Sequence, residues 1–330
     1  MTPEPAPVEE LNDVTAGALL PERPVRGHKG TFGRLLVVAG SLDFAGSALL
    51  VCTAAGRAGA GLVTLAVPES LQPLFAARIV EATTLGLPED DVEEVEPEGA
   101  LARILDHEHD ALVVGPGLRP GLTTVELIRG LLGVAEDGPP PAVVDAEALR
   151  SLAADDEWWL GVRRPCVLTP HTGEFARLRA ASGIPAGADG DLLGDDRARA
   201  AAATDAARRW GQVVVLKGAR TVIAAPDGRL ARATFENPAL ASGGTGDVLS
   251  GTIGALLAQR LDPYAAARLG VFLHGTAGES VRDRLGDSGL LASDLLFELA
   301  LARKRLTAAR TRRTAERKLG FGTRPAGISS

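Results

Sequence analysis

Cysteine is nearly absent from this 330-residue chain, in which only Cys52 and Cys166 occur. Two thiols cannot form the multi-bridge framework of a small secreted scaffold, and such a count suits a reducing compartment. The first ten residues are rich in Pro and Glu and lack the basic stretch and apolar core of a secretory signal. The apolar stretch 47–67 is interrupted by Arg57 and several glycines, so no membrane span is expected. We therefore expect a cytoplasmic protein.

The chain also lacks an excess of positive charge. Its formal net charge is −7 and its isoelectric point is near 5.4, which argues against a general nucleic-acid surface. With 45% hydrophobic residues it is long enough to bury a large core, either as two domains or as one large α/β domain, and the second option fits better. A Walker-type nucleotide site is absent, because the glycine-rich stretch 56–61 has no Lys-Ser/Thr pair.

Short apolar runs bounded by Gly or Pro alternate with alanine-rich helical patterns. The runs predict strands at 34–39, 62–67, 111–114, 142–144, 166–168, 213–216 and 221–224. Helices are predicted at 47–58, 123–132, 173–181, 195–210, 247–259, 263–285 and 292–301. Buried parallel strands separated by helices have this pattern, so we predict a doubly wound α/β fold with a mainly parallel sheet.

Five of these runs are followed by residues able to bind or react. In such sheets ligands lie beyond the carboxyl ends of the strands, so these positions are the ones to inspect. Glycine, a carboxylate, His or Lys occurs there in each case, which turn chemistry alone explains poorly. The segments are 40–47, 115–118, 145–149, 169–174 and 217–221.

The most informative segment is Gly-Gly-Thr-Gly-Asp at 243–247, which leads into an apolar helix. Glycines allow the backbone to approach a ligand, and the first amides of a helix are free donors for an anion. The segment therefore predicts a phosphate site, with Asp247 placed to deprotonate a substrate hydroxyl. A helix that is simply capped after a flexible loop is the alternative.

Other candidates have two interpretations each. Gly115 and Gly117 resemble part of a dinucleotide fingerprint, but the spacing is wrong, and a tight turn near a ligand fits better. His171 either starts a helix with Glu174 in its first turn or faces a ligand. Lys217 is either a solvated strand end or a phosphate contact.

Three further residues have side chains of a type that can bind metal ions. Asp145 either caps the next helix or holds a metal-bound water, since magnesium prefers oxygen ligands. His107 and His109 lack the partner spacing of a zinc site, so we interpret them as surface residues.

Several blocks in fixed order resemble the bacterial ADP-dependent NAD(P)H-hydrate dehydratases, a ribokinase-like repair family. The blocks are 28–33, 39–41, 59–63, 115–118, 144–146, 168–174, 216–219 and 242–251. The resemblance implies a three-layer α/β sandwich over 25–301, with a flexible extension at 1–24 and a basic, partly disordered tail at 302–330. No match to the epimerase domain often fused to such enzymes is seen, because fewer than thirty residues precede the first block.

In that family a nucleoside diphosphate phosphorylates the hydroxyl of hydrated NADH or NADPH, and loss of phosphate with a proton restores the dihydronicotinamide. Asp247 would act as the base, with Mg²⁺ screening the phosphates and with metal ligands not identified. The resemblance places the hydrate at Ser47, Ala48, Gly115, Gly117, His171 and Asp247. It places ADP at Lys217, Gly218, Ala219, Arg220, Thr221, Gly243, Gly244, Thr245 and Gly246. A homo-oligomer, for example a tetramer, is also implied.

Two departures from the family pattern stand out. Ser47 follows Gly46 where Ala is expected, and a basic run begins at Arg303. That run is interpreted as a solvated tail, with an arm for an acidic partner as the alternative. Two other functions stay open: a ribokinase-like kinase acting on a vitamin precursor, since the same site can phosphorylate a stable alcohol, and a non-enzymatic adenine-nucleotide sensor.

Overall fold

A single large sheet organises the chain in the computed structural model, which describes residues 8–318 except 92, 135–137 and 186. The strand order is β1-β12-β11-β10-β9-β8-β7-β2-β3-β4. The strands are β1 (Glu9–Glu10), β2 (Arg34–Val38), β3 (Leu62–Pro68), β4 (Thr83–Leu87), β7 (Ala111–Val114), β8 (Ala142–Val144), β9 (Cys166–Leu168), β10 (Val213–Leu216), β11 (Val222–Ala224) and β12 (Leu230–Arg232). From β4 to β10 all neighbours are parallel, and β11 is antiparallel to both β10 and β12. β5 (Glu89–Asp91) and β6 (Glu94–Val95) form a separate hairpin.

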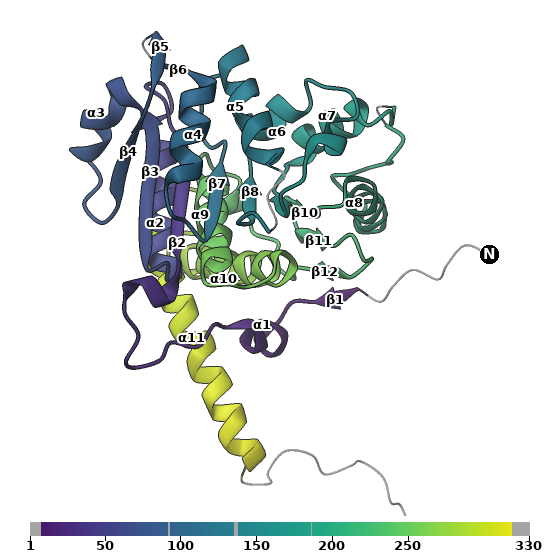
Figure 1. The fold of residues 1–330 in the computed structure, drawn as a ribbon. Coiled ribbons are helices and arrows are strands. Elements are labelled where there is room, and N and C mark those ends of the chain that lie inside the picture. The colour runs from purple at the N-terminus through teal and green to yellow at the C-terminus, as the bar shows by residue number, and fades with distance from the viewer. Residues whose placement is uncertain (1–7, 92, 135–137, 186, 319–330) are drawn as a thin grey trace, which may run out of the picture.

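Helices cover both faces of this sheet (Figure 1). The helices are α1 (Asp13–Leu19), α2 (Ala45–Ala58), α3 (Gln72–Ala76), α4 (Pro97–Asp106), α5 (Leu122–Leu132), α6 (Glu147–Leu152), α7 (Thr172–Ala181), α8 (Asp196–Trp210), α9 (Thr245–Ala258), α10 (Pro263–Leu285) and α11 (Ala292–Lys318). Side chains of α2, α9, α10 and α11 share one buried cluster, and those of α4 to α8 share the other. The predicted three-layer α/β sandwich is confirmed.

Alternation along the strands divides the core between the two layers. Leu35 and Val37 of β2 belong to the cluster with α2 and α9, whereas Leu36 and Val38 belong to the cluster with α4 and α5. Successive side chains of a strand point to opposite faces, so an uninterrupted apolar run is what a doubly covered strand requires.

Helices α2 and α9 lie unusually close together. A β-carbon at Gly251 would overlap the backbone carbonyl of Val51, and one at Gly254 would overlap the side chain of Val113 in β7. Glycine at these positions lets α9 press against both its neighbour and the sheet. The N-terminal ends of α2 and α9 are thereby held side by side.

The topology places the five segments 40–47, 115–118, 145–149, 169–174 and 217–221 at the carboxyl ends of the parallel strands. β2 lies inside the sheet, with β3 and β4 on one side and β7 to β10 on the other. After β2 the chain adds β3 and β4 on one side and then β7 to β10 on the other, so the strand order reverses between β2 and β7. Such a reversal of strand order is the switch point where ligands bind in open parallel sheets. Because β10, β9, β8, β7 and β2 are consecutive and parallel, their carboxyl ends form one continuous row.

The predicted strands are all present, but others were missed. β4 carries Thr83, Thr84 and Gly86, and β12 is three residues long with an arginine, so neither has the continuous apolar pattern of a central strand. β4 is an edge strand, and β12 has only the two-residue strand β1 beyond it, so both lie at the periphery of the sheet. Their existence therefore depends on pairing with neighbours that the local sequence does not show.

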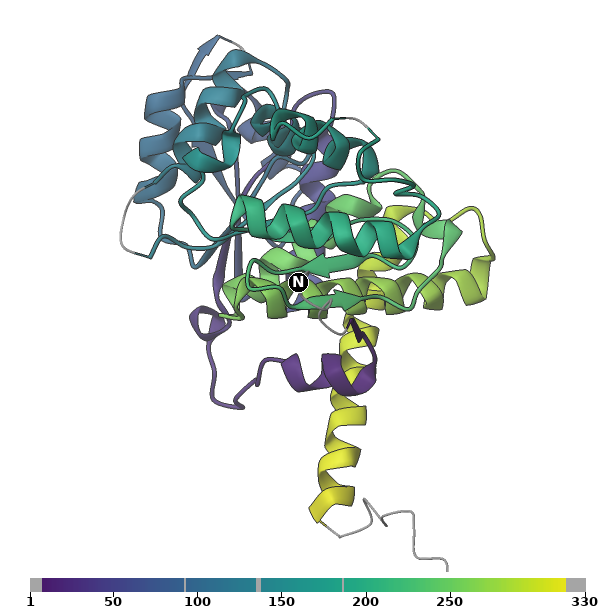
Figure 2. The same cartoon turned by 90° about the vertical axis from the view of Figure 1, so that its right-hand side faces the viewer.

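The predicted termini differ from those of the structure. Residues 9–10 pair with β12, and Asn12 caps α1 by accepting hydrogen bonds from the amides of Val14 and Thr15. α11 does not end at residue 301 but continues to Lys318, extending from the body with α1 beside it (Figure 2). The composition of the tail suggested solvation, but Leu306 is buried, and Gly17 of α1 lies against it. The remaining tail, residues 319–330, lies outside the described residues.

Truncation of one side chain tests this revised boundary. We expect Leu306→Ala to lower the free energy of unfolding by about 2–4 kcal/mol, because it leaves a cavity between α11 and α1. Urea denaturation measures the change. Lys304→Ala, which alters an exposed neighbour on the same helix, is the control and should change stability by less than about 0.5 kcal/mol. Equal stability of Leu306→Ala and wild type would restore the boundary near residue 301.

Candidate active site

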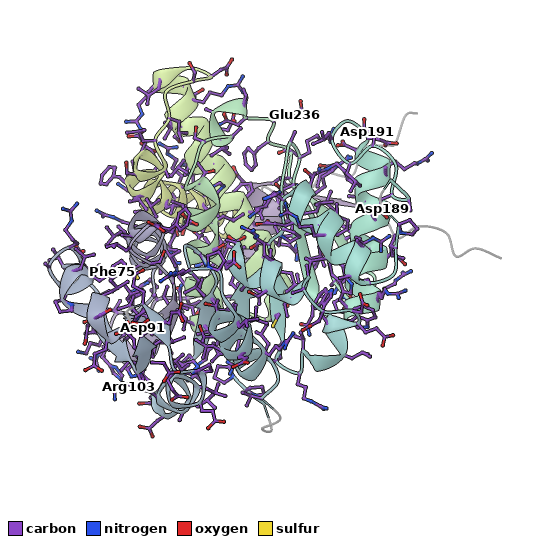
Figure 3. The ribbon with its side chains drawn as sticks, turned by 90° about the horizontal axis from the view of Figure 1, so that it is seen from above. Phe75, Asp91, Arg103, Asp189, Asp191 and Glu236 are labelled. Carbon is purple, nitrogen blue, oxygen red and sulfur yellow. The ribbon has the colours of Figure 1, made fainter. Side chains whose placement is uncertain are left out.

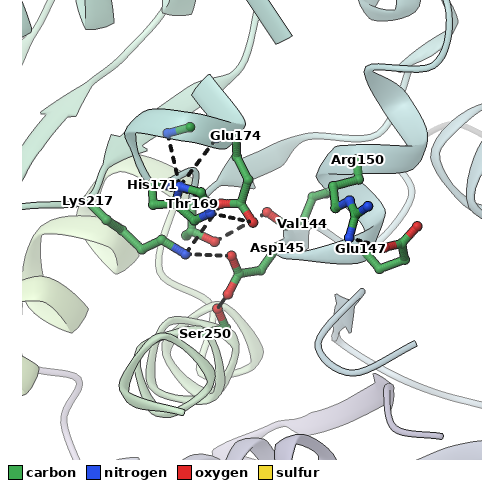
Figure 4. A network of polar contacts seen from close by, with 10 residues as sticks. Val144, Asp145, Glu147, Arg150, Thr169, His171, Glu174, Lys217 and Ser250 are labelled. Carbon is green, nitrogen blue, oxygen red and sulfur yellow. Dashed lines mark hydrogen bonds and ion pairs between the residues drawn. The ribbon is translucent and has the colours of Figure 1, made fainter. Parts of the chain in front are cut away.

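A buried ion pair joins two strand ends to helix α9 (Figure 4). Lys217 follows β10, and its Nζ donates a hydrogen bond of 2.8 Å to Oδ1 of Asp145, which follows β8. The hydroxyl of Ser250 in α9 donates to Oδ2 of the same carboxylate at 2.6 Å. Glu174 of α7 places its Oε2 at 3.9 Å from the same Nζ. The side chain of Asp145 does not cap α6, so the capping interpretation is wrong. Its role toward a metal-bound water stays a prediction.

Charges in this network shift one another. Burial raises the pKa of Glu174, and the charge of Lys217 opposes that rise. Burial alone would lower the pKa of Lys217, but Asp145 and Glu174 raise it above its ordinary value. Lys217 therefore stays cationic at neutral pH and supplies a fixed positive charge below the carboxyl edge of the sheet.

The N-terminus of α9 provides free amide donors at the same place. Gly244 precedes the helix with φ of +85°, a conformation suited to glycine. The hydroxyl of Thr245 donates to the carbonyls of Leu240 and Ser242 at 2.8 and 2.9 Å, which fixes the preceding loop. Within the described chain, the amides of Gly246 and Asp247 have no hydrogen-bond partner. The free amide donors that the predicted anion site requires are therefore present.

Asp247 lies in the first turn of α9, where its carboxyl is largely buried. Burial raises its pKa to about 6, while a hydrogen bond with Ser47 lowers the pKa; Asp145 raises it and Lys217 lowers it. A carboxyl with this pKa is ionised at neutral pH and is a stronger base than an exposed aspartate. Ser47, at the start of α2, stands where the family pattern has Ala. In the structure it contacts the carboxyl of Asp247.

Two glycines shape the loop opposite Asp247. Gly115 and Gly117 have φ of +119° and +67°, and a β-carbon at Gly115 would overlap the carbonyl of Asp145. A β-carbon at Gly117 would lie 2.8 Å from Cβ of Ser47. This is a tight turn packed against the α2 loop rather than a dinucleotide fingerprint. Ala48 is fully buried, and its Cβ lies 2.8 Å from where a β-carbon at Gly40 would be.

His171 caps α7 and is also half exposed. Its Nδ1 accepts hydrogen bonds from the amides of Gly173 and Glu174, and Glu174 accepts one from the amide of His171. The ring nitrogen Nε2 lies 3.4 Å from Oε1 of Glu174, and the His171 side chain is 56% exposed. Because Nδ1 is an acceptor, the proton of the neutral ring resides on Nε2. The capping interpretation is right, and the exposed ring leaves the ligand interpretation open.

A cavity of about 550 Å³ opens beside Lys217 and the start of α9. It is lined by Lys217, Gly218, Ala219, Thr221, Ala233, Phe235, Glu236, Asn237, Pro238, Leu240, Ala241, Thr245, Gly246, Leu249, Val271, His274 and Gly275. Figure 3 shows Glu236 on the far side of the molecule from Phe75 and Asp91. The lining is apolar at Phe235, Leu240 and Val271, and its polar end lies at Lys217 and Gly246.

Most of the predicted nucleotide residues border this cavity, but three do not. Gly243 and Gly244 are outside its lining, and the guanidinium of Arg220 lies among Glu10, Asp196 and Glu236. Asn237 and His274 line the cavity but were missed, because one lies in a turn and the other inside an apolar helix. The ring of His274 donates through Nε2 to the carbonyl of Thr245 at 3.0 Å, and burial lowers its pKa to about 4.

Comparison with known proteins decides the family. A family model described as NAD(P)H-hydrate dehydratase matches residues 35–300. The chain belongs to this family. The ADP-dependent (S)-NAD(P)H-hydrate dehydratase of Neisseria meningitidis serogroup B is 36% identical over 85% of this chain and 88% of its own length. The bifunctional NAD(P)H-hydrate repair enzyme Nnr of Moorella thermoacetica is 44% identical over 84% of this chain, and the chain spans about half the length of such bifunctional relatives.

Solved structures agree with the fold. The ADP/ATP-dependent NAD(P)H-hydrate dehydratase of Bacillus subtilis, co-crystallised with ATP/Mg²⁺, superposes with a TM-score of 0.75 and 33% identity over 91% of this chain and 99% of that one. A hydroxyethylthiazole kinase of Pyrococcus horikoshii, at 15% identity and a TM-score of 0.56, shares the fold alone. No helix in the described ranges combines the length and hydrophobicity needed to cross a bilayer.

The buried ion pair yields a stability prediction. Lys217→Met should lower the free energy of unfolding by about 3 kcal/mol at pH 8, because buried carboxylates lose their cation. The loss should shrink at pH 5. Without Lys217 the pKa of Glu174 rises further, and a group whose pKa is raised by folding favours the folded state at low pH and disfavours it as pH rises.

Urea denaturation at both pH values checks this expectation. Lys304→Met, the same substitution at an exposed site, is the control and should change stability little at either pH. A loss for Lys217→Met that is equal at pH 5 and pH 8 would mean that the effect is packing rather than charge.

Proposed function

We propose that this chain dehydrates the (S)-hydrates of NADH and NADPH back to the reduced cofactors, using ADP and releasing AMP and phosphate. The observation that carries the proposal is Asp247, a carboxyl with a raised pKa in the same helical turn as the unpartnered amide of Gly246. This arrangement places a base beside an anion site, as phosphorylation of a hydroxyl requires.

The nucleotide is proposed to occupy the cavity beside α9. The apolar lining by Phe235, Leu240 and Val271 suits the adenine ring, and the polar end at Lys217 and Gly246 suits the phosphates. Thr221 and Ala219 lie on the loop that borders the same space. The Neisseria relative is named for ADP and the Bacillus structure was grown with ATP, which supports an adenine nucleotide here.

The hydrate is proposed to lie on the other side of Asp247. In support, Ser47 contacts Asp247, Gly117 packs against Ser47, and the ring of His171 is exposed. Asp247 takes the proton of the substrate hydroxyl, whose oxygen attacks the terminal phosphorus of ADP, and the bond from phosphorus to the bridging oxygen breaks to release AMP. The carbon–oxygen bond of the phosphorylated hydrate then breaks. Phosphate leaves with the electron pair, a ring proton is lost, and the dihydronicotinamide is restored.

Positioning and electrostatics provide most of the rate enhancement in this scheme. Free amides at α9 and the charge of Lys217 are fixed before the reaction, so they stabilise the transferring phosphoryl without reorganisation. Alignment of donor and acceptor can contribute about 7 kcal/mol or more, whereas a base contributes about 10²- to 10⁴-fold in rate.

The residues fit a magnesium ion held mainly by the nucleotide. No group of three or more His, Cys, Asp or Glu side chains in the described residues is arranged to bind a metal. Asp247 lies in the first turn of α9 at the phosphate end, and Asp145 accepts hydrogen bonds from Lys217 and Ser250 close to it. Mg²⁺ usually keeps several waters and binds through phosphates and one or two carboxylates. When bound, it would screen the negative charge of the phosphates.

Two other functions are less well supported. A kinase for a vitamin precursor would use the same anion site and base, and a nucleotide sensor would use the cavity alone. Membership in the dehydratase family over residues 35–300 favours the dehydratase over both. A homo-oligomer, a tetramer included, is part of the proposal and is measured by light scattering.

Substitution of the base tests the function directly. Asp247→Asn should retain the fold and lose about 10²- to 10⁴-fold in kcat, because it removes the proton acceptor. The assay follows the absorbance of the reduced nicotinamide after ADP or ATP is added to hydrated NADH or NADPH. Thermal unfolding should show equal or greater stability, since ionisation of a carboxyl whose pKa is raised by burial disfavours the folded state. Full activity of this variant would refute the proposed role.

The pKa of Asp247 also predicts a pH profile. The rate constant kcat/KM should fall as pH drops through about 6, because the carboxyl becomes protonated and cannot accept a proton. Ser47→Ala removes a hydrogen bond that lowers this pKa, so its acidic limb should move to higher pH. Asp13→Asn, an exposed site on α1, is the control. An acidic limb that Ser47→Ala leaves unmoved would assign the limb to another group.

A further inference from the structure

The N-terminal strand lies behind the wall of the nucleotide cavity. Glu9 and Glu10 of β1 pair with Ala231 and Arg232 of β12, and the amide of Leu11 donates to the carbonyl of Arg232 at 2.9 Å. Of the residues that follow β12, Ala233 and Phe235 to Asn237 line that cavity. A segment expected to be a separate extension is thus one strand away from the proposed ADP site.

Arg220 connects this strand to the loop that borders the cavity. Its neighbours Ala219 and Thr221 line the cavity, while Arg220 itself has φ of +52°, in the left-handed region that disfavours non-glycine residues. Its amide donates to the carbonyl of Phe235 at 2.9 Å. Such a backbone conformation persists only when surrounding contacts hold it.

The side chain of Arg220 supplies those contacts and is not part of the cavity lining. One of its acidic neighbours, Glu236, does line the cavity and lies 3.9 Å from the guanidinium. The same guanidinium lies 3.1 Å from the carboxylate of Asp196 at the start of α8 and 3.5 Å from that of Glu10. Arg232 donates to Asp196 at 2.9 Å and to Glu10 at 3.0 Å, so the two arginines share both acids. Three elements, β1, α8 and β12, meet at this cluster. Its side chains are 22–40% exposed, a degree at which salt weakens but does not abolish such pairs.

We propose that Glu10 is a positioning residue for nucleotide binding. Together with Asp196 it fixes Arg220, and through Arg220 it holds the loop 218–221 in the shape that accepts the adenosine nucleotide. The inference rests on the proposed function for the identity of the ligand. It assigns Arg220 a structural role in this chain, in place of a direct contact with ADP.

Glu10→Gln tests the proposal with little change in shape. The Kd for ADP with Mg²⁺, measured by isothermal titration calorimetry, should rise about threefold to tenfold, as expected when the partly exposed carboxylate shared by Arg220 and Arg232 loses its charge. At saturating ADP kcat should be unchanged while KM for ADP rises, because the reacting groups are untouched. Asp196→Asn, which reaches the same guanidinium from α8, should act in the same direction.

Glu9→Gln is the matched control. Glu9 belongs to the same two-residue strand but pairs with Arg268 of α10. It should lower the melting temperature about as much as Glu10→Gln and leave the Kd for ADP unchanged. If both variants weaken ADP equally, attachment of the strand rather than fixation of Arg220 is responsible, and the proposal is wrong.

The direction in which the Kd for ADP changes distinguishes a positioning role of Arg220 from a direct contact with the phosphates. If Arg220 contacts the phosphates, loss of Glu10 frees it, and ADP should bind as tightly or more tightly; that result overturns the proposal. In the double variant Glu10→Gln with Arg220→Gln, the two losses should not add, because both remove one interaction. Wild type that binds ADP but leaves the hydrate unconverted refutes the proposed function alone, whereas wild type that does not bind ADP refutes both.

Discussion

The pair formed by Lys217 and Asp145 is the interaction on which the site depends. It spans from β10 to β8, and the hydroxyl of Ser250 extends it into α9. A lysine at the end of an apolar strand is stable there only because two acids oppose the effect of burial. The same pair fixes the helix whose first turn carries Asp247. Removing the cation would therefore disturb both the electrostatics of the site and the position of its base.

Electrostatic complementarity explains why several costly groups coexist in a small volume. Asp247 and Glu174 both have a pKa raised by burial, and His274 is held neutral by burial near them. The charged form of each of these groups would have a lower free energy in water than in the protein. Clusters of groups with shifted pKa values are typical of functional sites. Family membership and this clustering are independent lines of support for the proposed function.

Much of the fold and part of the site could be predicted from the sequence. The central strands have continuous apolar runs, so the strands and the residues that follow them could be predicted. The Gly-rich segment before α9 predicted an anion site, and the structure has unpartnered amides there. β1, β12 and the extension of α11 could not be predicted, because short peripheral strands and charged helices depend on contacts with residues distant in sequence. For the same reason Asp145 looked like a cap, since Lys217 is far from it in sequence and adjacent only through the sheet.

The close contact of Gly251 with the backbone of Val51 constrains how the enzyme works. Because α2 and α9 touch without intervening side chains, Ser47 and Asp247 are mounted on one rigid unit. Entry and exit of ligands must then be accommodated by the surrounding turns, and the helices themselves cannot slide apart. An alanine at this glycine, remote from any ligand, would separate the serine from the carboxylate and should appear in a screen as a loss of catalysis with no altered contact in the pocket.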